Sequence, residues 1–303
     1  MAPKHVYWLA DGAGKDVGDT RATVMKDWIV SQGNAELIIY GGDIYNEGKA
    51  SEFDRFGAQM RNDVTLFCET PGNHDWKTTK TSPVTGTVPF AYEAFWSTRP
   101  SRQPIDVTKK GGARYEHAID INGWRFVFLD TGICEDRPWP MGDANRRDWL
   151  RQKLTEVPGR AKIICAHHSR VSCGKHGNND RVDELWRTLF DNSGTPLAAL
   201  TMGGHDHNVN IYSPRPKDKP HKNTVPFSQG IHLVVNGAGG RSFDALLKDK
   251  PGDFAKLADQ YCVTEIELVN ANTAKIRTWA FGTTPKSTVA PKSDQVRELI
   301  IDV

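Results

Sequence analysis

In the first part of the chain, short apolar runs alternate with stretches of helical periodicity. Val24, Met25, Trp28 and Ile29 recur at the spacing of one helix face, and the apolar runs are of strand length. The predicted order is strand, helix, strand, helix, strand, over His5–Leu9, Thr20–Val30, Glu36–Tyr40, Ala50–Met60 and Val64–Cys68. This alternation is typical of βαβ units and therefore predicts a parallel sheet.

The rest of the chain carries further strands and helices, interrupted by two segments of a different kind. Residues 76–112 and 212–226 are predicted to be insertions that cap one edge of the domain. Strands are predicted at 115–119, 124–129, 161–165, 197–202, 231–235, 263–268 and 274–280, and helices at 148–154 and 182–190. Because there is no internal repeat or clear linker, we expect residues 1–303 to form a single domain with two sheets and flanking helices.

Composition and charge exclude several classes of protein. Apolar residues make up 38% and charged residues 25% of the 303 residues, which excludes disordered and fibrous chains. The formal net charge of +2 is too close to neutral to predict a nucleic-acid or anionic-membrane partner. No apolar run reaches the ~18 residues that a membrane span needs, so no membrane partner is expected.

The N-terminus and the cysteines bear on the compartment of the protein. The chain runs directly into its first strand, without a basic and apolar leader. We therefore expect either a cytoplasmic protein or one whose export signal is absent from this sequence. The five cysteines, at positions 68, 134, 165, 173 and 262, are far apart and form no Cys-x-x-Cys pair, so we expect free thiols.

Side chains of the types that bind metal ions follow five of the predicted strands. They are Asp11, Asp43, Asn73 with His74 and Asp75, His167 with His168, and His205 with His207. Taken singly, each group is a common turn, helix-cap or surface pattern. In open α/β sheets, however, ligands bind at the carboxyl ends of the strands. Five such ends with Asp, Asn or His at the tip therefore predict a functional site.

In this order the motifs resemble those of the calcineurin-like metallophosphoesterases. The motifs are Asp11, Gly-Asp at 42–43, Gly-Asn-His-Asp at 72–75, His167 and Gly-His-Asp-His at 204–207, followed by a glycine-rich stretch at 235–240. Residues 166–172 and the sequence Lys175-His176-Gly177 are most similar to the purple acid phosphatases and their bacterial relatives. The resemblance implies an α/β fold, a four-layer α/β/β/α sandwich with two mixed β-sheets and flanking helices.

The resemblance also implies a binuclear metal centre. One metal ion would be held by Asp11, Asp43 and His207, and the other by Asp43, Asn73, His167 and His205, with Asp43 bridging the two. Two metal ions ~3.5–4 Å apart are able to hold both the attacking oxygen and a phosphoryl oxygen. Mixed carboxylate, amide and imidazole ligands suit Fe, Mn and Zn better than Ca or Mg. The expected cofactors are therefore two metal ions, Fe with Zn, Mn or a second Fe.

The resemblance implies other roles for residues next to the predicted ligands. His74 is predicted to be catalytic, as an electrophile or general acid, and Asp75 to orient it by accepting its ring N–H. His176 is predicted to be a catalytic residue that contacts the substrate from a loop, and the alternative is a solvated loop histidine. His168 is predicted to point away from the metals, because neighbouring residues alternate faces in an extended segment.

The chain departs from the family pattern at two positions. Many members have Asp-x-His at the first motif, and here Ala13 replaces the histidine. Purple acid phosphatases supply a tyrosinate three residues after the bridging aspartate, where this chain has Asn46, preceded by Tyr45. Either Tyr45 reaches the metal, which favours Fe(III) and a visible colour, or Asn46 or water completes the site. The sequence leaves both alternatives open.

The resemblance implies an enzyme that hydrolyses phosphomonoesters by in-line attack of a metal-bound hydroxide. A phosphodiesterase for a small or cyclic nucleotide is the alternative, because the predicted metal ligands suit both reactions. A non-catalytic metal-binding scaffold ranks lower, since Asp43 and His74 are both present. The expected partner is a small phosphorylated substrate, and we expect a monomer because no interface pattern is evident.

Overall fold

The computed structural model describes residues 2–12, 20–44, 47–60, 66–75, 116–132, 144–214, 230–244, 255–257, 260–283, 291 and 298–303. The predicted insertion at 76–112 and nearly all of that at 212–226 lie outside these residues, as do Ala13, Tyr45 and Asn46. The alternatives for completing the first metal site with Tyr45 or Asn46 therefore stay predictions.

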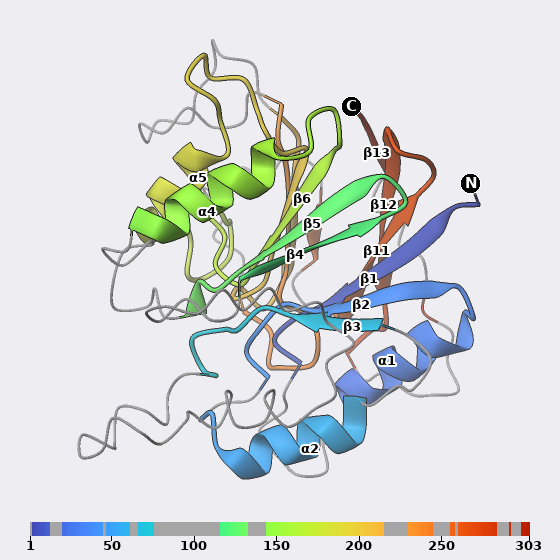
Figure 1. Ribbon diagram of the computed structural model, residues 1–303. Coiled ribbons are helices and arrows are strands. Elements are labelled where there is room, and N and C mark those ends of the chain that lie inside the picture. The colour runs from blue at the N-terminus through green and yellow to red at the C-terminus, as the bar shows by residue number, and fades with distance from the viewer. Residues whose placement is uncertain are drawn as a thin grey trace.

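The described residues form two β-sheets that lie face to face between two layers of helices (Figure 1). One sheet has six strands in the order β13 (Leu299–Asp302), β12 (Thr273–Ala280), β11 (Cys262–Leu268), β1 (Lys4–Leu9), β2 (Ala35–Tyr40) and β3 (Leu66–Glu69). The other has seven, in the order β10 (Ala255–Leu257), β8 (Val209–Tyr212), β9 (His232–Asn236), β7 (Leu200–Gly203), β6 (Lys162–Ala166), β5 (Trp124–Leu129) and β4 (His117–Ile121).

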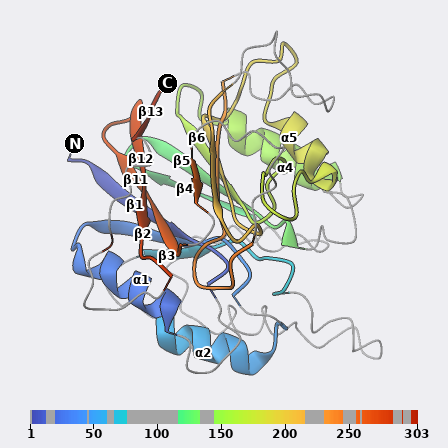
Figure 2. The ribbon, with the colours of Figure 1, turned by 180° about the vertical axis from the view of Figure 1, so that it is seen from behind.

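Helices cover the outer face of each sheet, as the view from behind also shows (Figure 2). Helices α1 (Arg21–Ser31) and α2 (Ala50–Met60) pack against the six-stranded sheet. Helices α4 (Ala144–Thr155) and α5 (Asp183–Thr188) pack against the other sheet, and a 3-10 turn, η3 (Asp180–Val182), leads into α5. This arrangement confirms the predicted four-layer α/β/β/α sandwich.

Strand β1 contributes apolar side chains to two separate cores. Val6 and Trp8 lie in the apolar core between the sheets, whereas Tyr7 and Leu9 face the core beneath α1 and α2. Successive side chains of a strand point to opposite faces, so a strand that is buried on both faces must be apolar throughout. The same alternation in β2 and β6 explains why the sequence shows continuous apolar runs there.

Parallel pairing brings the carboxyl ends of strands from both sheets to one end of the sandwich. Strands β1, β2 and β3 are parallel neighbours, and so are β5, β6, β7 and β9. The loops that follow β1, β2, β3, β6 and β7 carry the Asp, Asn and His residues that the sequence analysis identifies as candidate metal ligands. The fold therefore places all five candidate motifs at the same end of the molecule.

Most predicted elements lie within a few residues of the observed ones, and three short strands were missed. The hairpin of β4 and β5 turns at Asn122 and Gly123, whose φ angles of 48° and 87° suit a tight two-residue turn. Strands β8, β10 and β13 were not predicted. Each has only three or four residues, which is too short for periodicity to identify.

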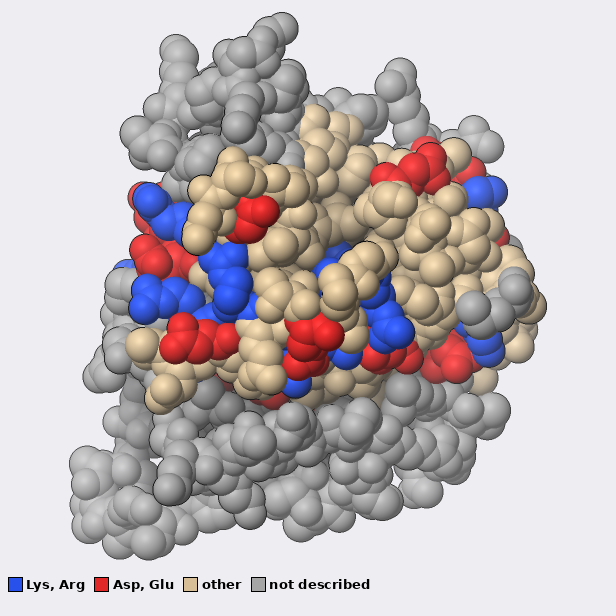
Figure 3. Space-filling model, turned by 45° about the horizontal axis from the view of Figure 1, so that its top comes forward, with Lys and Arg blue, Asp and Glu red and all other residues tan. Residues whose placement is uncertain are grey.

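The described surface carries charges of both signs. On the face drawn in Figure 3, lysines and arginines lie among aspartates and glutamates rather than in a continuous basic field. This agrees with the near-neutral net charge of +2. No helix in the described ranges combines the length and the apolar character that crossing a membrane requires.

Candidate metal centre

Asp11, Asp43 and His167 are brought together from three loops at the carboxyl ends of β1, β2 and β6. One potential ligand atom of each lies within 4.8 Å of the others, and all three residues are buried. Asp11 and Asp43 have φ angles of 55° and 54°, and His205 has 69°. Non-glycine residues in this left-handed region store strain, which persists where the surrounding structure enforces it, and such residues cluster at functional sites.

Asp11 links the loop after β1 to the two histidines after β7. Its Oδ1 lies 3.5 Å from Nε2 of His207. Its Oδ2 accepts a hydrogen bond of 2.9 Å from the backbone N–H of His205. The carboxylate is fully buried, so one oxygen is fixed by the backbone while the other faces the His207 ring.

Asp43 lies between the rings of two histidines. Its Oδ1 is 3.5 Å from Nε2 of His167 and accepts a 2.8 Å hydrogen bond from the backbone N–H of His74. Its Oδ2 is 3.7 Å from Nε2 of His74. The neighbouring Asn73 is 5% exposed and lines the same cavity. The backbone of the Gly-Asn-His-Asp motif at 72–75 thus holds the carboxylate of the Gly-Asp motif at 42–43.

Backbone carbonyls fix the orientation of two predicted ligand rings. Nδ1 of His167 lies 2.7 Å from the carbonyl oxygen of Gly41, and Nδ1 of His207 lies 2.8 Å from that of Ser242. A carbonyl only accepts hydrogen bonds, so Nδ1 carries the proton in both rings. Such a contact directs Nε2 towards the ligand position, as in many histidine metal sites.

Several buried polar atoms of the predicted ligand set have no hydrogen-bond partner among the described residues. They are Oδ1 of Asp11, Oδ1 of Asn73 and Nε2 of His167. A buried polar atom that lacks a partner costs about 1–3 kcal/mol, so such atoms are rare without a reason. Carboxylate oxygen, amide oxygen and imidazole nitrogen are together a donor set for Fe, Mn or Zn. These residues therefore fit a metal ion.

The electrostatics of the site favour a cation beside the two carboxylates. Burial alone would lower the pKa of His167, but Asp43 and Asp11 outweigh burial and raise that pKa to about 10. Burial would raise the pKa of the Asp43 carboxyl, but the imidazoles of His167 and His74 hold it below its usual value. Metal binding requires neutral imidazole and ionised carboxylate, so a metal ion would displace the proton of His167.

Asp75 has a different role from the predicted one. It was predicted to accept a hydrogen bond from the His74 ring. Instead, its Oδ2 accepts from the backbone N–H groups of Asp43 at 3.0 Å and Gly72 at 2.7 Å, and its Oδ1 accepts from Ile44 at 2.8 Å. Asp75 therefore connects the loop that carries Asp43 to the motif at 72–75. Burial raises the pKa of the Asp75 carboxyl well above the usual range.

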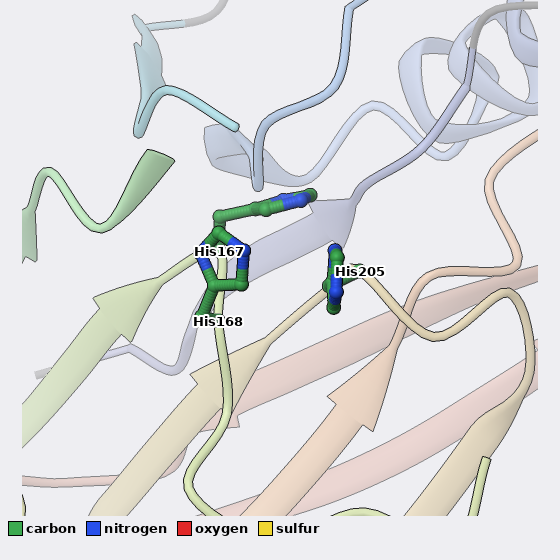
Figure 4. Close-up of side chains that lie close together, drawn as sticks. All are labelled: His167, His168 and His205. Carbon is green, nitrogen blue, oxygen red and sulfur yellow. The ribbon is translucent and has the colours of Figure 1, made fainter. Parts of the chain in front are cut away.

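His168 points into the site, which corrects the prediction that it points away. Figure 4 shows its ring beside those of His167 and His205, at the loops after β6 and β7. The centroids of the His168 and His205 rings are 4.4 Å apart. The alternation argument failed because β6 ends at Ala166, so the next residues are not extended. Burial lowers the pKa of His168 to about 3, so the ring is neutral.

His176 lies at the wall of a polar cavity of about 440 Å³ that includes Asp43, His74 and His205. Its ring centroid is 4.1 Å from that of His205, and its side chain is 41% exposed. Its backbone N–H donates a 2.8 Å hydrogen bond to Oδ1 of Asp206, which positions the loop. The structure thus brings His176 to the cavity that four of the predicted ligands line, namely Asp43, Asn73, His205 and His207.

Arg241 and Asp244 are among the cavity residues that the sequence reasoning missed. Nη1 of Arg241 lies 3.4 Å from Nε2 of His74. Oδ2 of Asp244 lies 3.6 Å from Nδ1 of His207 and 3.7 Å from Nε2 of His176. Both follow the glycine-rich stretch at 235–240, and that stretch was the only signal that the segment approaches the site.

The glycines of this stretch allow two backbones to touch. A Cβ at Gly239 would lie 2.1 Å from the carbonyl oxygen of Ala10, and one at Gly240 would lie 2.4 Å from that of Gly12. The N–H of Gly239 donates to Ala10 and that of Arg241 to Asp11, each at 2.9 Å. The loop after β9 therefore holds the loop that carries Asp11.

Residues 16–209 match the calcineurin-like phosphoesterase family, and the chain belongs to that family. Its members are phosphoesterases that depend on a dinuclear metal centre. Asp11 lies just outside the matched residues, and the other predicted ligands lie inside them. The fold and the family therefore make this chain a metallophosphoesterase by class.

A curated relative is the 3',5'-cyclic adenosine monophosphate phosphodiesterase CpdA of Pseudomonas aeruginosa. It is 23% identical over 218 residues, which are 68% of each chain. Among solved structures, a purple acid phosphatase from yellow lupin matches with a TM-score of 0.66 and 16% identity, over 100% of this chain and 54% of that one. The chain thus spans about half the length of the lupin enzyme.

Two further structures share the fold. GAP50, the anchor in the inner membrane complex of Plasmodium, matches with a TM-score of 0.64 and 13% identity, over 100% of this chain and 90% of that one. PhoD matches with a TM-score of 0.62 and 12% identity, over 100% of this chain and 69% of that one. At these identities the three structures show a common fold and leave the substrate open.

Proposed function

We propose that this chain is a binuclear metal-dependent enzyme that hydrolyses phosphomonoesters, as purple acid phosphatases do. The observation that carries the proposal is a set of buried ligand-type atoms on Asp11, Asn73 and His167, beside His74, which make no hydrogen bond to a described residue. They lie at the carboxyl ends of the strands, next to a polar cavity. The cavity is small enough to suit a compact phosphorylated substrate.

The ligands of the two metals would be those that the motifs predict. Asp11, Asp43 and His207 would hold one, and Asp43, Asn73, His167 and His205 the other. When bound, the pair would lower the pKa of a water molecule and offset negative charge on the phosphoryl oxygens. Iron with zinc, manganese or a second iron fits the mixed oxygen and nitrogen donors.

His74 would act on the substrate rather than on a metal. Its ring is 17% exposed and lines the cavity, while its backbone N–H holds Asp43. A proton on Nε2 would pass to the leaving-group oxygen as the bond to phosphorus breaks, so that an alcohol leaves rather than an alkoxide. His176, on the cavity wall, would donate a hydrogen bond to a phosphoryl oxygen.

A phosphodiesterase for a cyclic nucleotide is the second candidate. The observation in its favour is the 23% identity to a cyclic adenosine monophosphate phosphodiesterase across 68% of both chains. Cationic side chains favour the monoester instead. Lys175, Arg181 and Arg241 line the cavity, and a monoester dianion carries more charge for them than a diester monoanion.

Hydrolysis assays on metal-reconstituted protein test the proposal. Metal-depleted protein is loaded with Fe, Zn or Mn and assayed with p-nitrophenyl phosphate, bis(p-nitrophenyl) phosphate and cyclic AMP. We expect metal-dependent turnover with the monoester preferred, loss of turnover in Asp43→Asn, and unchanged turnover in the matched surface variant Asp27→Asn. Preference for cyclic AMP would establish the second candidate, and loaded protein without turnover on any ester would overturn both.

A further inference from the structure

Arg241 faces His74 across the cavity from an independent loop. Its Nη1 lies 3.4 Å from Nε2 of His74, and Nε2 lies 3.7 Å from Oδ2 of Asp43. Two short contacts therefore lead from the predicted bridging carboxylate to the guanidinium. Arg241 is partly buried and lines the cavity, so its charge is directed inwards rather than into bulk solvent.

The three buried arginines of the described ranges pair with carboxylates. Arg125 pairs with Asp120, Arg146 with Glu116, and Arg170 with Asp180 and Asp183. Arg241 forms no such ion pair with a described residue, and its close polar contact there is an imidazole nitrogen. A partly buried cation without an anion is costly, so the position of Arg241 at the cavity wall favours a bound anion.

Arg241 is held in place by its backbone. Its N–H donates a 2.9 Å hydrogen bond to the carbonyl oxygen of Asp11. The preceding Gly240 has a φ of 150° and lies so close to Gly12 that a Cβ would meet the Gly12 carbonyl oxygen at 2.4 Å. The backbone position of Arg241 is thus fixed relative to a predicted metal ligand, which reduces the ordering cost of binding an anion.

The guanidinium of Arg241 has more donors than its contact with His74 uses. Nη1 donates to Nε2 of His74 across 3.4 Å, and a guanidinium has five N–H donors in all. An oxygen of a phosphoryl group in the cavity would accept from the remaining N–H groups, and a doubly charged group would accept most strongly.

We infer that Arg241 binds a non-bridging phosphoryl oxygen and gives the site its preference for phosphomonoester dianions over diester monoanions. This inference deepens the proposed function and rests on it. A diester has only two non-bridging oxygens and a single negative charge. The guanidinium therefore gains more from the monoester in both charge and number of acceptors.

Binding of inorganic phosphate to metal-loaded protein tests the inference without turnover. Isothermal titration calorimetry compares wild type, Arg241→Met and Arg241→Lys, with Arg187→Met on the exposed surface of α5 as the matched control. We expect phosphate to bind about 10- to 100-fold more weakly to Arg241→Met, since a hydrogen bond to a charged group contributes ~1.5–3 kcal/mol. Arg241→Lys keeps the charge and should fall in between, while Arg187→Met should match wild type.

Steady-state assays on the same proteins test the specificity. The ratio of kcat/KM for p-nitrophenyl phosphate to that for bis(p-nitrophenyl) phosphate should fall at least tenfold in Arg241→Met, with metal content unchanged. An unchanged ratio together with unchanged phosphate affinity would overturn the inference and leave the proposed function intact. Loss of metal in Arg241→Met would also overturn it, because Arg241 would then act through the metal site. Wild-type protein that hydrolyses neither ester would refute the proposed function itself.

Discussion

At the scale of single residues, the backbone and the side chain of His74 have separate roles. The backbone N–H of His74 donates a 2.8 Å hydrogen bond to Oδ1 of Asp43, and the ring faces the cavity. A substitution that removes only the ring therefore leaves the hydrogen bond that positions Asp43. This separation allows catalysis and metal binding to be tested independently.

His74→Ala should reduce turnover by about 10²- to 10⁴-fold, which is the usual contribution of a general acid. Metal content, measured by elemental analysis, should stay near wild type because the backbone contact to Asp43 remains. The loss should be greater for alkyl phosphates than for p-nitrophenyl phosphate, since a poor leaving group needs the proton more. A parallel loss of metal would show that His74 is a ligand.

His176→Ala should lower kcat/KM for monoesters by about tenfold, in the range of one hydrogen bond to a charged group. The side chain is 41% exposed and its loop is held by the backbone bond to Asp206, so folding and metal content should not change. Kinetic assays alongside elemental analysis measure both. Kinetics identical to wild type would mean that His176 is a solvated loop histidine.

At the scale of elements, the site depends on loops whose backbones touch. Gly239 packs its Cα against Ala10, and Gly72 packs against Asp43, where an added Cβ would lie 2.1 Å from Oδ1. Glycine is required at these positions because no side chain fits between the two backbones. The loops that carry the predicted ligands are therefore positioned by neighbouring glycine-rich loops.

Gly239→Ala should destabilise the fold by roughly 1–3 kcal/mol, the usual cost of overpacking, and weaken metal retention because Ala10 precedes Asp11. Gly159→Ala is a suitable control. A Cβ added at Gly159 would have nothing within 4 Å, and its φ of 75° costs only about 1 kcal/mol. Thermal unfolding and elemental analysis distinguish the two variants. Full metal retention in Gly239→Ala would show that this contact does not position Asp11.

The sequence predicted the elements that long apolar runs define and the motifs at their ends. It did not predict the direction of His168, because the alternation argument assumed an extended chain beyond the strand, whereas β6 ends at Ala166. It did not predict Arg241 either, which is 167 residues from His74 along the chain. Contacts between loops of such separation arise from the packing of the two sheets, and local patterns carry no information about that packing.

At the scale of the whole molecule, the candidate centre lies across the seam between the two sheets. Asp11 and Asp43 follow strands of the six-stranded sheet, and His167 and His205 follow strands of the other. Within the core, Nε1 of Trp8 donates a 3.0 Å hydrogen bond to the carbonyl oxygen of Asn236, from one sheet to the other. Metal ions at the seam would add a further connection between the sheets.

Removal of the metals should therefore lower the melting temperature of the protein. A ligand that binds only the folded state stabilises it by RT ln(1 + [L]/Kd), about 4 kcal/mol at a thousandfold excess over Kd. Thermal unfolding is compared with and without a chelator, with Asp43→Asn as the control that should show little difference. An equal chelator effect in both proteins would contradict binding at Asp43.

Elemental analysis of the purified protein is the most direct test of a binuclear centre. We predict two metal ions per chain, with iron among them, in wild-type protein and loss of both in Asp43→Ala, because Asp43 is the residue proposed to bridge the two positions. Wild-type protein that retains no metal, and regains none when Mn, Zn or Fe is added, would contradict the account.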